Sequence, residues 1–184
     1  MSEPGEPKPE GTREYSFEEG VQEVLRRIEE KLKEKDVVVV AFNSTGSPNV
    51  GKTSLSGRLR NDLFSRNIFS YDAEQVDYEH LKMVNPNLDP NKSTGRYTAI
   101  AHTLEEQAVT GGKLVILFST EGAIFNREIL NSHLVEIAQA FGIREIKEID
   151  ILILLDRPDR RASKGYIGDV HICNELAVDK YLKK

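Results

Sequence analysis

The sequence contains no tryptophan and a single cysteine, Cys173. One cysteine excludes an internal disulfide and fits a reducing compartment, so we expect a cytoplasmic protein in which Cys173 is a small buried or half-buried residue. No apolar run approaches the roughly 20 residues that a membrane-spanning helix needs, and residues 1–10 lack the apolar core of a secretory signal. Positive charge is not in excess, because the formal net charge at pH 7 is -5. We therefore expect neither a membrane nor a nucleic acid as partner.

What is present is the composition of an ordinary globular domain, with 184 residues of which 39% are hydrophobic and 30% charged. Residues 1–15 are rich in Pro, Gly, Glu and Lys, which predicts a disordered tail. Residues 16–184 are then expected to form one domain. Ser16 followed by Glu19 has capping-box spacing, and the apolar residues after it recur at helical spacing to about Lys35.

Short β-branched runs alternate with helical patterns along the rest of the chain. The first run, 37–42, is continuously apolar, which is typical of a strand buried on both faces of a parallel sheet. The alternation predicts an α/β protein with three α/β/α layers around a mostly parallel sheet. Residues 84–96 are rich in Pro, Asn and Asp and predict a long loop. The predicted strands are 37–42, 68–71, 114–118 and 151–155, and the predicted helices are 16–35, 52–63, 97–109, 127–141 and 170–182.

A phosphate-binding motif lies between the first predicted strand and the helix that follows it. Residues 46–53 match the pattern G-x-x-x-x-G-K-[ST] at every fixed position. Glycines let the backbone N–H groups turn inward around an anion, and the start of a helix adds its positive dipole end. Lys52 can reach the β- and γ-phosphates, and the Thr53 hydroxyl can bind Mg²⁺. The motif predicts the P-loop NTP hydrolase fold and a nucleoside triphosphate site formed by Gly46, Ser47, Pro48, Asn49, Val50, Gly51, Lys52, Thr53 and Ser54.

The centre of this loop, Pro48-Asn49-Val50, resembles the translation-factor class of GTPases, particularly the ribosome-assembly branch. A GTPase of that kind also carries Asp-x-x-Gly after a later strand and an Asn-Lys-x-Asp that selects guanine. No aspartate in this chain is followed by Gly three residues on, and Asn91-Lys92 is not followed by the guanine-reading Asp. The nearest counterpart of the first motif is 119–122, where Ser119 replaces the Asp. A GTP-binding switch or assembly factor is therefore the alternative interpretation.

Three strand ends carry a second set of residues. The second predicted strand ends at Asp72, and the third runs into Glu121-Gly122. The fourth ends in Asp156-Arg157-Pro158, and Arg160-Arg161, Lys164 and Asp169 follow it. In this order, over about residues 16 to 182, the chain resembles the P-loop small-molecule kinases of the uridine kinase and phosphoribulokinase group. The stretch 164–166, Lys-Gly-Tyr, is also similar to residues of the adenylylsulfate kinases.

The resemblance to kinases implies ATP and Mg²⁺ as cofactors, and transfer of the γ-phosphate to a hydroxyl of a small metabolite such as a nucleoside or sugar phosphate. Asp72, at a strand end where open α/β sheets bind ligands, would accept the proton of that hydroxyl. Glu121 would hold magnesium through water or orient the substrate. Arg157 and Arg160 would contact the phosphates and Arg161 would stabilise the transferred group. For these residues a turn-capping carboxylate and a solvated charged face are the structural alternatives.

Two features depart from the kinase pattern. The family continues after its lid with another strand and a loop that contacts the base, whereas we find no apolar run for a fifth strand here. The centre of the phosphate loop also differs from the Ser- and Gly-rich loops of these kinases. A non-catalytic nucleotide-binding module is therefore a third possibility. The acceptor, the preference for ATP or GTP and the oligomeric state stay open, and His171 is interpreted as a surface or core histidine.

Overall fold

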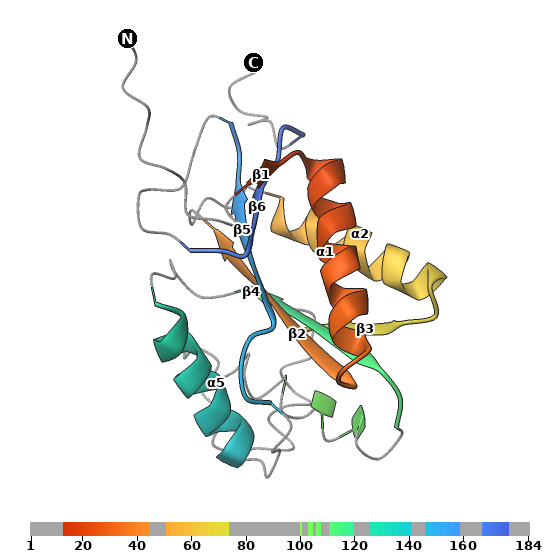
Figure 1. The fold of residues 1–184 in the computed structure, drawn as a ribbon, viewed down its shortest axis with the longest axis vertical. Coiled ribbons are helices and arrows are strands. Elements are labelled where there is room, and N and C mark those ends of the chain that lie inside the picture. The colour runs from red at the N-terminus through yellow and green to blue at the C-terminus, as the bar shows by residue number, and fades with distance from the viewer. Residues whose placement is uncertain are drawn as a thin grey trace.

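A computed structural model describes residues 13–44, 51–73, 100, 103–104, 106–107, 111–119, 126–140, 146–158 and 167–176. Within these ranges six strands form one sheet in the order β1-β6-β5-β2-β4-β3, and every neighbouring pair is parallel (Figure 1). The predicted α/β class with a mostly parallel sheet is therefore confirmed. The strands are β1 (Glu14–Tyr15), β2 (Val37–Ser44), β3 (Phe69–Asp72), β4 (Leu114–Ser119), β5 (Ile151–Asp156) and β6 (Val170–Cys173).

Helices α1 (Phe17–Leu32), α2 (Lys52–Ser65) and α5 (Arg127–Ala140) lie against this sheet. The Ser16 hydroxyl accepts a hydrogen bond from the Glu19 N–H at 3.4 Å, as the capping-box spacing predicts. The long loop predicted at 84–96 lies outside the described residues. No helix in the described ranges is long and apolar enough to cross a membrane. The described part of the helix predicted at 97–109 is helical and comprises Ile100, Thr103, Leu104, Glu106 and Gln107.

Three layers result from the way the chain crosses the sheet. From β2 the chain passes through α2 to β3, beyond β4, whereas from β4 it passes through α5 back across β2 to β5. Right-handed crossovers that run in opposite directions place their helices on opposite faces of a sheet. Figure 1 shows α1 and α2 on one side of the sheet and α5 on the other. This is the three-layer arrangement that the alternation of strands and helices predicts.

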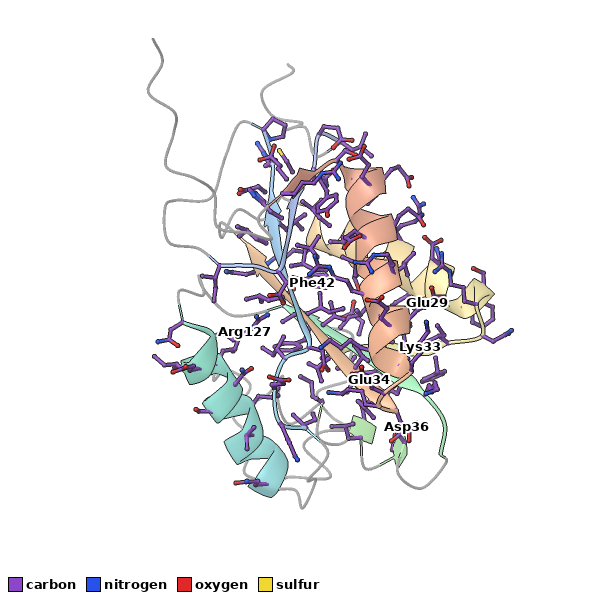
Figure 2. The ribbon with its side chains drawn as sticks, viewed as in Figure 1. Glu29, Lys33, Glu34, Asp36, Phe42 and Arg127 are labelled. Carbon is purple, nitrogen blue, oxygen red and sulfur yellow. The ribbon has the colours of Figure 1, made fainter. Side chains whose placement is uncertain are left out.

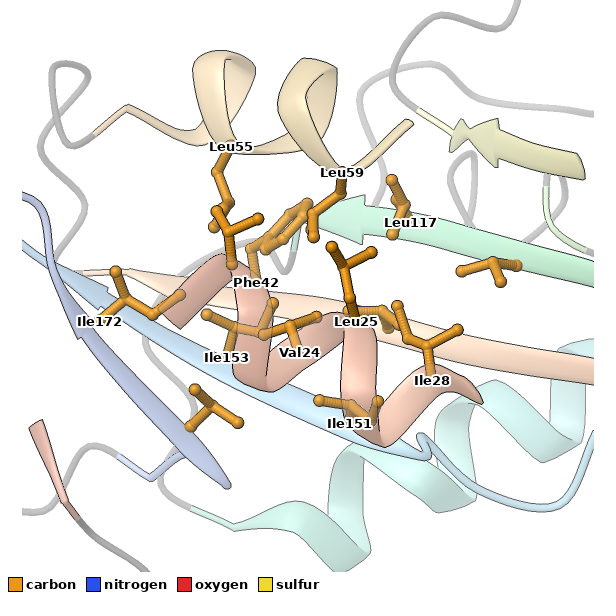
Figure 3. Packing of buried hydrophobic residues seen from close by; sticks show 14 of the residues in the cluster. Val24, Leu25, Ile28, Phe42, Leu55, Leu59, Leu117, Ile151, Ile153 and Ile172 are labelled. Carbon is orange, nitrogen blue, oxygen red and sulfur yellow. The ribbon is translucent and has the colours of Figure 1, made fainter. Parts of the chain in front are cut away.

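The central strand β2 separates two hydrophobic cores. Successive residues of a strand point to opposite faces, so Val38, Val40 and Phe42 pack on the side of α1 and α2, and Val39 and Ala41 pack on the side of α5. Burial on both faces explains why this strand is a continuous apolar run in the sequence. Figure 3 shows the first core, in which Val24, Leu25 and Ile28 of α1 and Leu55 and Leu59 of α2 lie over Leu117, Ile151, Ile153 and Ile172 of the sheet.

The prediction of a helix over 170–182 is wrong at its beginning, because Val170–Cys173 is strand β6, paired with β5. This strand also corrects the expectation that no further strand follows the fourth. Val170 and Ile172 pack into the core of α1 and α2, while His171 lies opposite Leu154 in the register. A run of four residues is too short for helical and strand periodicity to be distinguished. Residues 177–182 of the predicted helix lie outside the described residues.

The predicted disordered tail is corrected at its end, because Glu14–Tyr15 is strand β1. This strand extends the sheet beyond β6, with Glu14 opposite His171 and Tyr15 opposite Ile172. A polar segment gains this order from backbone hydrogen bonds to an open strand edge, which composition does not reveal. Residues 1–12 lie outside the described residues.

Candidate nucleotide-binding site

The carboxyl ends of the strands lie together at one edge of the sheet, because all strands are parallel. The chain leaves β2 toward β3 on one side and leaves the neighbouring β5 toward β6 on the other side. Adjacent strands whose connections run in opposite directions form a topological switch point, and open α/β sheets bind ligands in the crevice outside such a point. The loop predicted to bind phosphates follows β2, so the topology places this motif at the expected edge.

The structure confirms the strand and the helix that the phosphate motif requires on either side of its loop. β2 ends at Ser44, and α2 begins at Lys52 directly after Gly51. Gly51 has φ 92° and ψ 26°, a left-handed conformation that a residue with a Cβ atom rarely adopts, so a glycine fits this position. Residues 45–50, with Gly46, Ser47, Pro48, Asn49 and Val50, lie outside the described residues.

The beginning of α2 differs from the beginnings of α1 and α5. Ser16 caps α1, and Asn126 caps α5 by accepting hydrogen bonds from the N–H groups of Glu128 at 2.9 Å and Ile129 at 3.3 Å. Both helices also carry acidic residues in the first turn, whereas α2 has neither a side-chain cap nor an acidic residue there. The first N–H groups of a helix have no partner inside the helix and attract anions. The start of α2 therefore lacks the side-chain compensation found at α1 and α5, which fits a helix start that receives a phosphate group.

Lys52, Thr53 and Ser54 occupy the first turn of α2, where Lys52 is half-buried and the other two are exposed. The Thr53 hydroxyl is one oxygen ligand of the kind that Mg²⁺ takes. In P-loop proteins Mg²⁺ is held by the P-loop Ser/Thr hydroxyl together with a carboxylate, and substrate phosphates and water complete its shell, so Thr53 would supply one of the protein ligands. Glu121, the other predicted metal ligand, lies outside the described residues.

Buried polar side chains gather at the same edge of the sheet. Removing a polar group from water costs free energy unless it is hydrogen-bonded, so such a cluster requires an internal network or a ligand. Among the buried polar residues in the described ranges, Thr103 lies away from a strand end, in the helix predicted at 97–109. The buried polar residues at or next to the carboxyl ends of strands, or in α2, are Asn43, Ser56, Asp72, Ser119, Asp156, Arg157 and Asn174.

Asp72, the predicted proton acceptor, is the last residue of β3 and is 8% exposed. The Ser56 hydroxyl of α2, itself 4% exposed, donates a hydrogen bond to Asp72 Oδ2 at 2.5 Å. This bond joins the strand end to the helix that begins at the phosphate loop. The preceding Tyr71 is half-buried, and burial raises the pKa of its hydroxyl despite a hydrogen bond with Thr103. Nothing in the sequence pattern pointed to Ser56, because its partner lies on a different element.

The end of β5 carries a second buried carboxylate, which the sequence marked only as the end of a strand. Asp156 is 1% exposed, and its Oδ2 lies 2.9 Å from His171 Nε2 on β6. His171 Nδ1 lies 4.0 Å from the Glu14 carboxylate on β1. The other oxygen, Asp156 Oδ1, is buried without a hydrogen-bond partner in the described part of the chain. This pairing was missed because 170–182 was predicted to be helical.

Arg157 follows Asp156 and is fully buried at this edge of the sheet. The Asn43 amide of β2 donates to the Ile167 carbonyl at 2.9 Å, and the Asn174 N–H donates to the Asp156 carbonyl at 2.7 Å. The described structure thus brings Lys52, Thr53, Ser54, Asp72 and Arg157 to the edge where the phosphate loop begins. Arg160 and Arg161 lie outside the described residues, so their positions stay predictions.

No protein-family model matches this chain, and no curated protein matches its sequence. Among solved structures, the chain is similar to a mutant of the APS kinase CysC from Mycobacterium tuberculosis, at 16% sequence identity and a TM-score of 0.40. The similarity covers 75% of this chain and 86% of that chain. A likeness of this size carries no argument about activity, so function has to be inferred from the chain's own residues.

Proposed function

We propose that this protein is an ATP-dependent phosphotransferase that moves the γ-phosphate to a hydroxyl of a small metabolite, such as a nucleoside or sugar phosphate. The observation that carries the proposal is the hydrogen bond between Ser56 and Asp72. It joins a buried carboxylate at a strand end to the helix that begins with Lys52 of the phosphate motif and has no side-chain cap. A phosphate site and a candidate base held on one framework are what phosphoryl transfer to a hydroxyl requires.

The proposed reaction needs positioning and neutralisation of charge more than covalent help from the protein. The acceptor oxygen attacks the γ-phosphorus, the bond from that phosphorus to the bridging β–γ oxygen breaks, and ADP leaves. Asp72 takes the proton of the acceptor hydroxyl. Lys52 and the N–H groups at the start of α2 hold the phosphates and stabilise the negative charge. Thr53 would hold Mg²⁺, which supplies further neutralisation of the β- and γ-oxygens when bound.

The remaining predicted residues complete this proposal. Arg160 and Arg161 would supply positive charge over the phosphates, and Glu121 would hold magnesium through water. Arg157 is fully buried, so its guanidinium would reach a phosphate only inside a closed site. The resemblance to the uridine kinase group and to adenylylsulfate kinases supplies the candidate acceptors and is part of the proposal.

A GTP-binding switch is the second candidate, and the wording of the loop, Pro48-Asn49-Val50, favours it. The end of β4 is an argument against it, because a buried Ser119 stands where such a GTPase has its metal-linked Asp. The two candidate functions differ in the nucleobase that the protein selects and in whether a phosphoryl acceptor is needed.

Thermal unfolding with MgATP and with MgGTP tests the binding step. A nucleotide that binds the native state at 100 times its dissociation constant adds about 2.7 kcal/mol to the free energy of unfolding. We expect this gain with MgATP, and we expect product from at least one of uridine, ribulose 5-phosphate and adenylylsulfate. A larger gain with MgGTP, without any phosphorylated product, would favour the switch. No gain with either nucleotide would exclude both candidates.

A further inference from the structure

The Ser56 hydroxyl links the two halves of the proposed reaction site, because its residue lies on α2 and its hydrogen-bond partner Asp72 ends β3. We propose that Ser56 is a positioning residue that sets the orientation of the Asp72 carboxylate toward the acceptor hydroxyl. This inference rests on the proposed phosphotransferase function. It adds a residue that neither the phosphate motif nor the resemblance to kinases includes.

The position of Ser56 on α2 gives the bond its significance. Ser56 follows Lys52 by four residues, and residues four apart lie on the same face of a helix, one turn from each other. The helix face that begins with the phosphate-binding lysine therefore continues with the hydroxyl that holds Asp72. Because a helix is rigid over one turn, the bond fixes the carboxylate relative to the turn of α2 that carries Lys52.

The chemistry of the pair suits a positioning role. A hydroxyl that donates to a carboxylate forms a charge-assisted hydrogen bond, which is stronger than one between neutral groups. A carboxylate has two oxygens and about four acceptor sites, so a hydrogen bond at Oδ2 is compatible with an acceptor proton at another site. The terminal torsion of an Asp side chain is broad, so the hydrogen bond from Ser56 narrows the orientations that the carboxylate takes.

Packing alone does not explain a serine at this position. Its neighbours Leu55 and Leu59 are fully buried in the core of α1 and α2, which apolar side chains fill. Serine is also neutral or unfavourable inside a helix, and burying its hydroxyl is costly without a partner. Alanine has the higher helix propensity and buries no polar group. The hydroxyl is therefore explained by the carboxylate that it holds.

The test compares Ser56→Ala with the wild type, using as probes uridine, ribulose 5-phosphate and adenylylsulfate. We expect Ser56→Ala to keep its Kd for MgATP and to lose kcat by roughly 10- to 100-fold, the range reached when a reacting group is misplaced by about 1 Å. Ser56→Thr keeps a hydroxyl and should recover most of kcat. Ser65→Ala makes the same change at an exposed serine of the same helix, so it should keep the wild-type kcat.

A double variant separates positioning from general damage to the fold. If Ser56 acts through Asp72, Ser56→Ala combined with Asp72→Asn should be no slower than Asp72→Asn alone, because the two residues work as one unit. Multiplied losses would contradict the proposal, and so would loss of MgATP binding in Ser56→Ala.

Ser56→Cys replaces the hydroxyl by a weaker donor of similar size, and it is the variant to measure if Ser56→Ala does not fold. An intermediate kcat in Ser56→Cys supports the proposal, and a wild-type kcat overturns it.

The role of Ser56 and the proposed function can fail separately. A wild-type protein that binds MgATP but phosphorylates no probe would overturn the proposed function itself. An active wild type with an unchanged Ser56→Ala variant would overturn only the role of Ser56.

Discussion

The two ends of the sheet use polar residues in different ways. At the carboxyl ends, buried polar side chains such as Asp72 and Asp156 lie at the edge of the sheet from which β2 leads to the phosphate motif. Beside the amino ends of β5 and β6 lies a groove of about 770 Å³ whose lining is charged. Figure 2 shows Lys33 and Glu34 at the end of α1 and Arg127 at the start of α5, which belong to this groove. Its charged residues are Arg26, Arg27, Lys31, Lys33, Arg127, Glu30, Glu34, Glu148, Asp150 and Asp169.

Several charged residues in or beside the groove form ion pairs with residues of opposite charge. Arg127 Nη1 donates to Asp169 at 2.8 Å, and Lys35 Nζ, beside the groove, donates to Asp150 at 2.6 Å. Burial alone would raise the pKa of Asp169, but hydrogen bonds from Arg127 and from the Leu152 N–H outweigh it and lower the pKa. Close by, hydrogen bonds from Arg26 and then Arg27 lower the pKa of Glu23 to about 2.

The comparison separates the carboxyl ends of the strands, where we propose the ligand site, from the amino ends, where the groove contains ion pairs. In the groove, Arg127 pairs with Asp169 and Asp150 pairs with Lys35, so these ion pairs contribute to stability, although Arg127 Nε is buried without a hydrogen-bond partner in the described residues. At the carboxyl ends, the start of α2 has no side-chain cap and no acidic residue in its first turn, and Asp156 Oδ1 is buried without a partner in the described structure. The residues of the proposed phosphate site also lie at this end and not in the groove. Changes at the carboxyl ends should therefore reduce activity, and changes in the groove should reduce stability.

The largest effect is expected for Lys52→Ala, which should abolish phosphoryl transfer because the β- and γ-phosphates lose their cation. The control is Lys33→Ala, which removes an exposed lysine of the groove and should leave turnover unchanged. Product formation and thermal unfolding measured on both variants give the comparison. Undiminished turnover in Lys52→Ala would remove the phosphate motif from the mechanism.

Asp72→Asn should come next, with a loss of about 10²- to 10⁴-fold in kcat, the usual contribution of general acid–base catalysis. Binding of MgATP should persist, because Asp72 acts on the acceptor. Asp62→Asn is a matched change at a partly exposed aspartate of α2 that pairs with Arg58, and it should keep wild-type kcat. Equal kcat values for the two variants would mean that Asp72 only ends a strand.

Arg127→Met should lower the free energy of unfolding by about 1–3 kcal/mol, because the half-buried Asp169 loses its charged partner. Turnover should change little, because the pair lies in the groove. Urea unfolding and kcat are the two measurements. A large loss of kcat at unchanged stability would reverse the comparison between the two ends.

The pH dependence of this pair sharpens the same test. The folded-state pKa of Asp169 is lowered, so its contribution is present above the unfolded value of about 3.9 and is lost as the pH falls through the lower folded value. The wild type should therefore converge with Arg127→Met in stability as the pH falls below about 4. If the difference in the free energy of unfolding between the wild type and Arg127→Met stays constant at acid pH, packing and not charge is responsible for the effect.

Gly57→Ala should give the smallest effect, a gain of about 0.4–1 kcal/mol in the free energy of unfolding. A Cβ atom at this helical glycine meets no atom within 4 Å, so the change costs no packing. Gly57 follows Ser56 but is exposed, and kcat should stay at the wild-type value. Chemical denaturation measures the gain. A loss of kcat here would mean that activity is sensitive to any change in α2.

Much of the fold was predictable because its signals are local. Strands β2, β4 and β5 are buried on both faces, so each is a continuous apolar run that stands out in the sequence. Strand β6 was not predictable, because its four residues contain the polar His171 and follow no distinct period. Strand β1 is stabilised by pairing with β6, and pairing between distant segments leaves no local trace.

As with the strands, the sequence predicts those parts of the candidate site that depend on neighbouring residues. The motif around Lys52 is a run of consecutive residues, and Asp72 is predicted as a site residue because it ends a strand. The partners of these residues were not predictable. Ser56 and Asp72 are 16 residues apart, and Asp156 and His171 are 15 apart on strands that the sequence did not both reveal.

By itself, the sequence determined the α/β class and the phosphate motif, because both depend on residues that are neighbours along the chain. Only the tertiary structure decided which strand ends meet, that Ser56 holds Asp72, and that Asp156 pairs with His171. The physical reason is that these contacts follow from strand order and helix packing. Strand order is set by the burial of both faces of the whole sheet and not by any one segment.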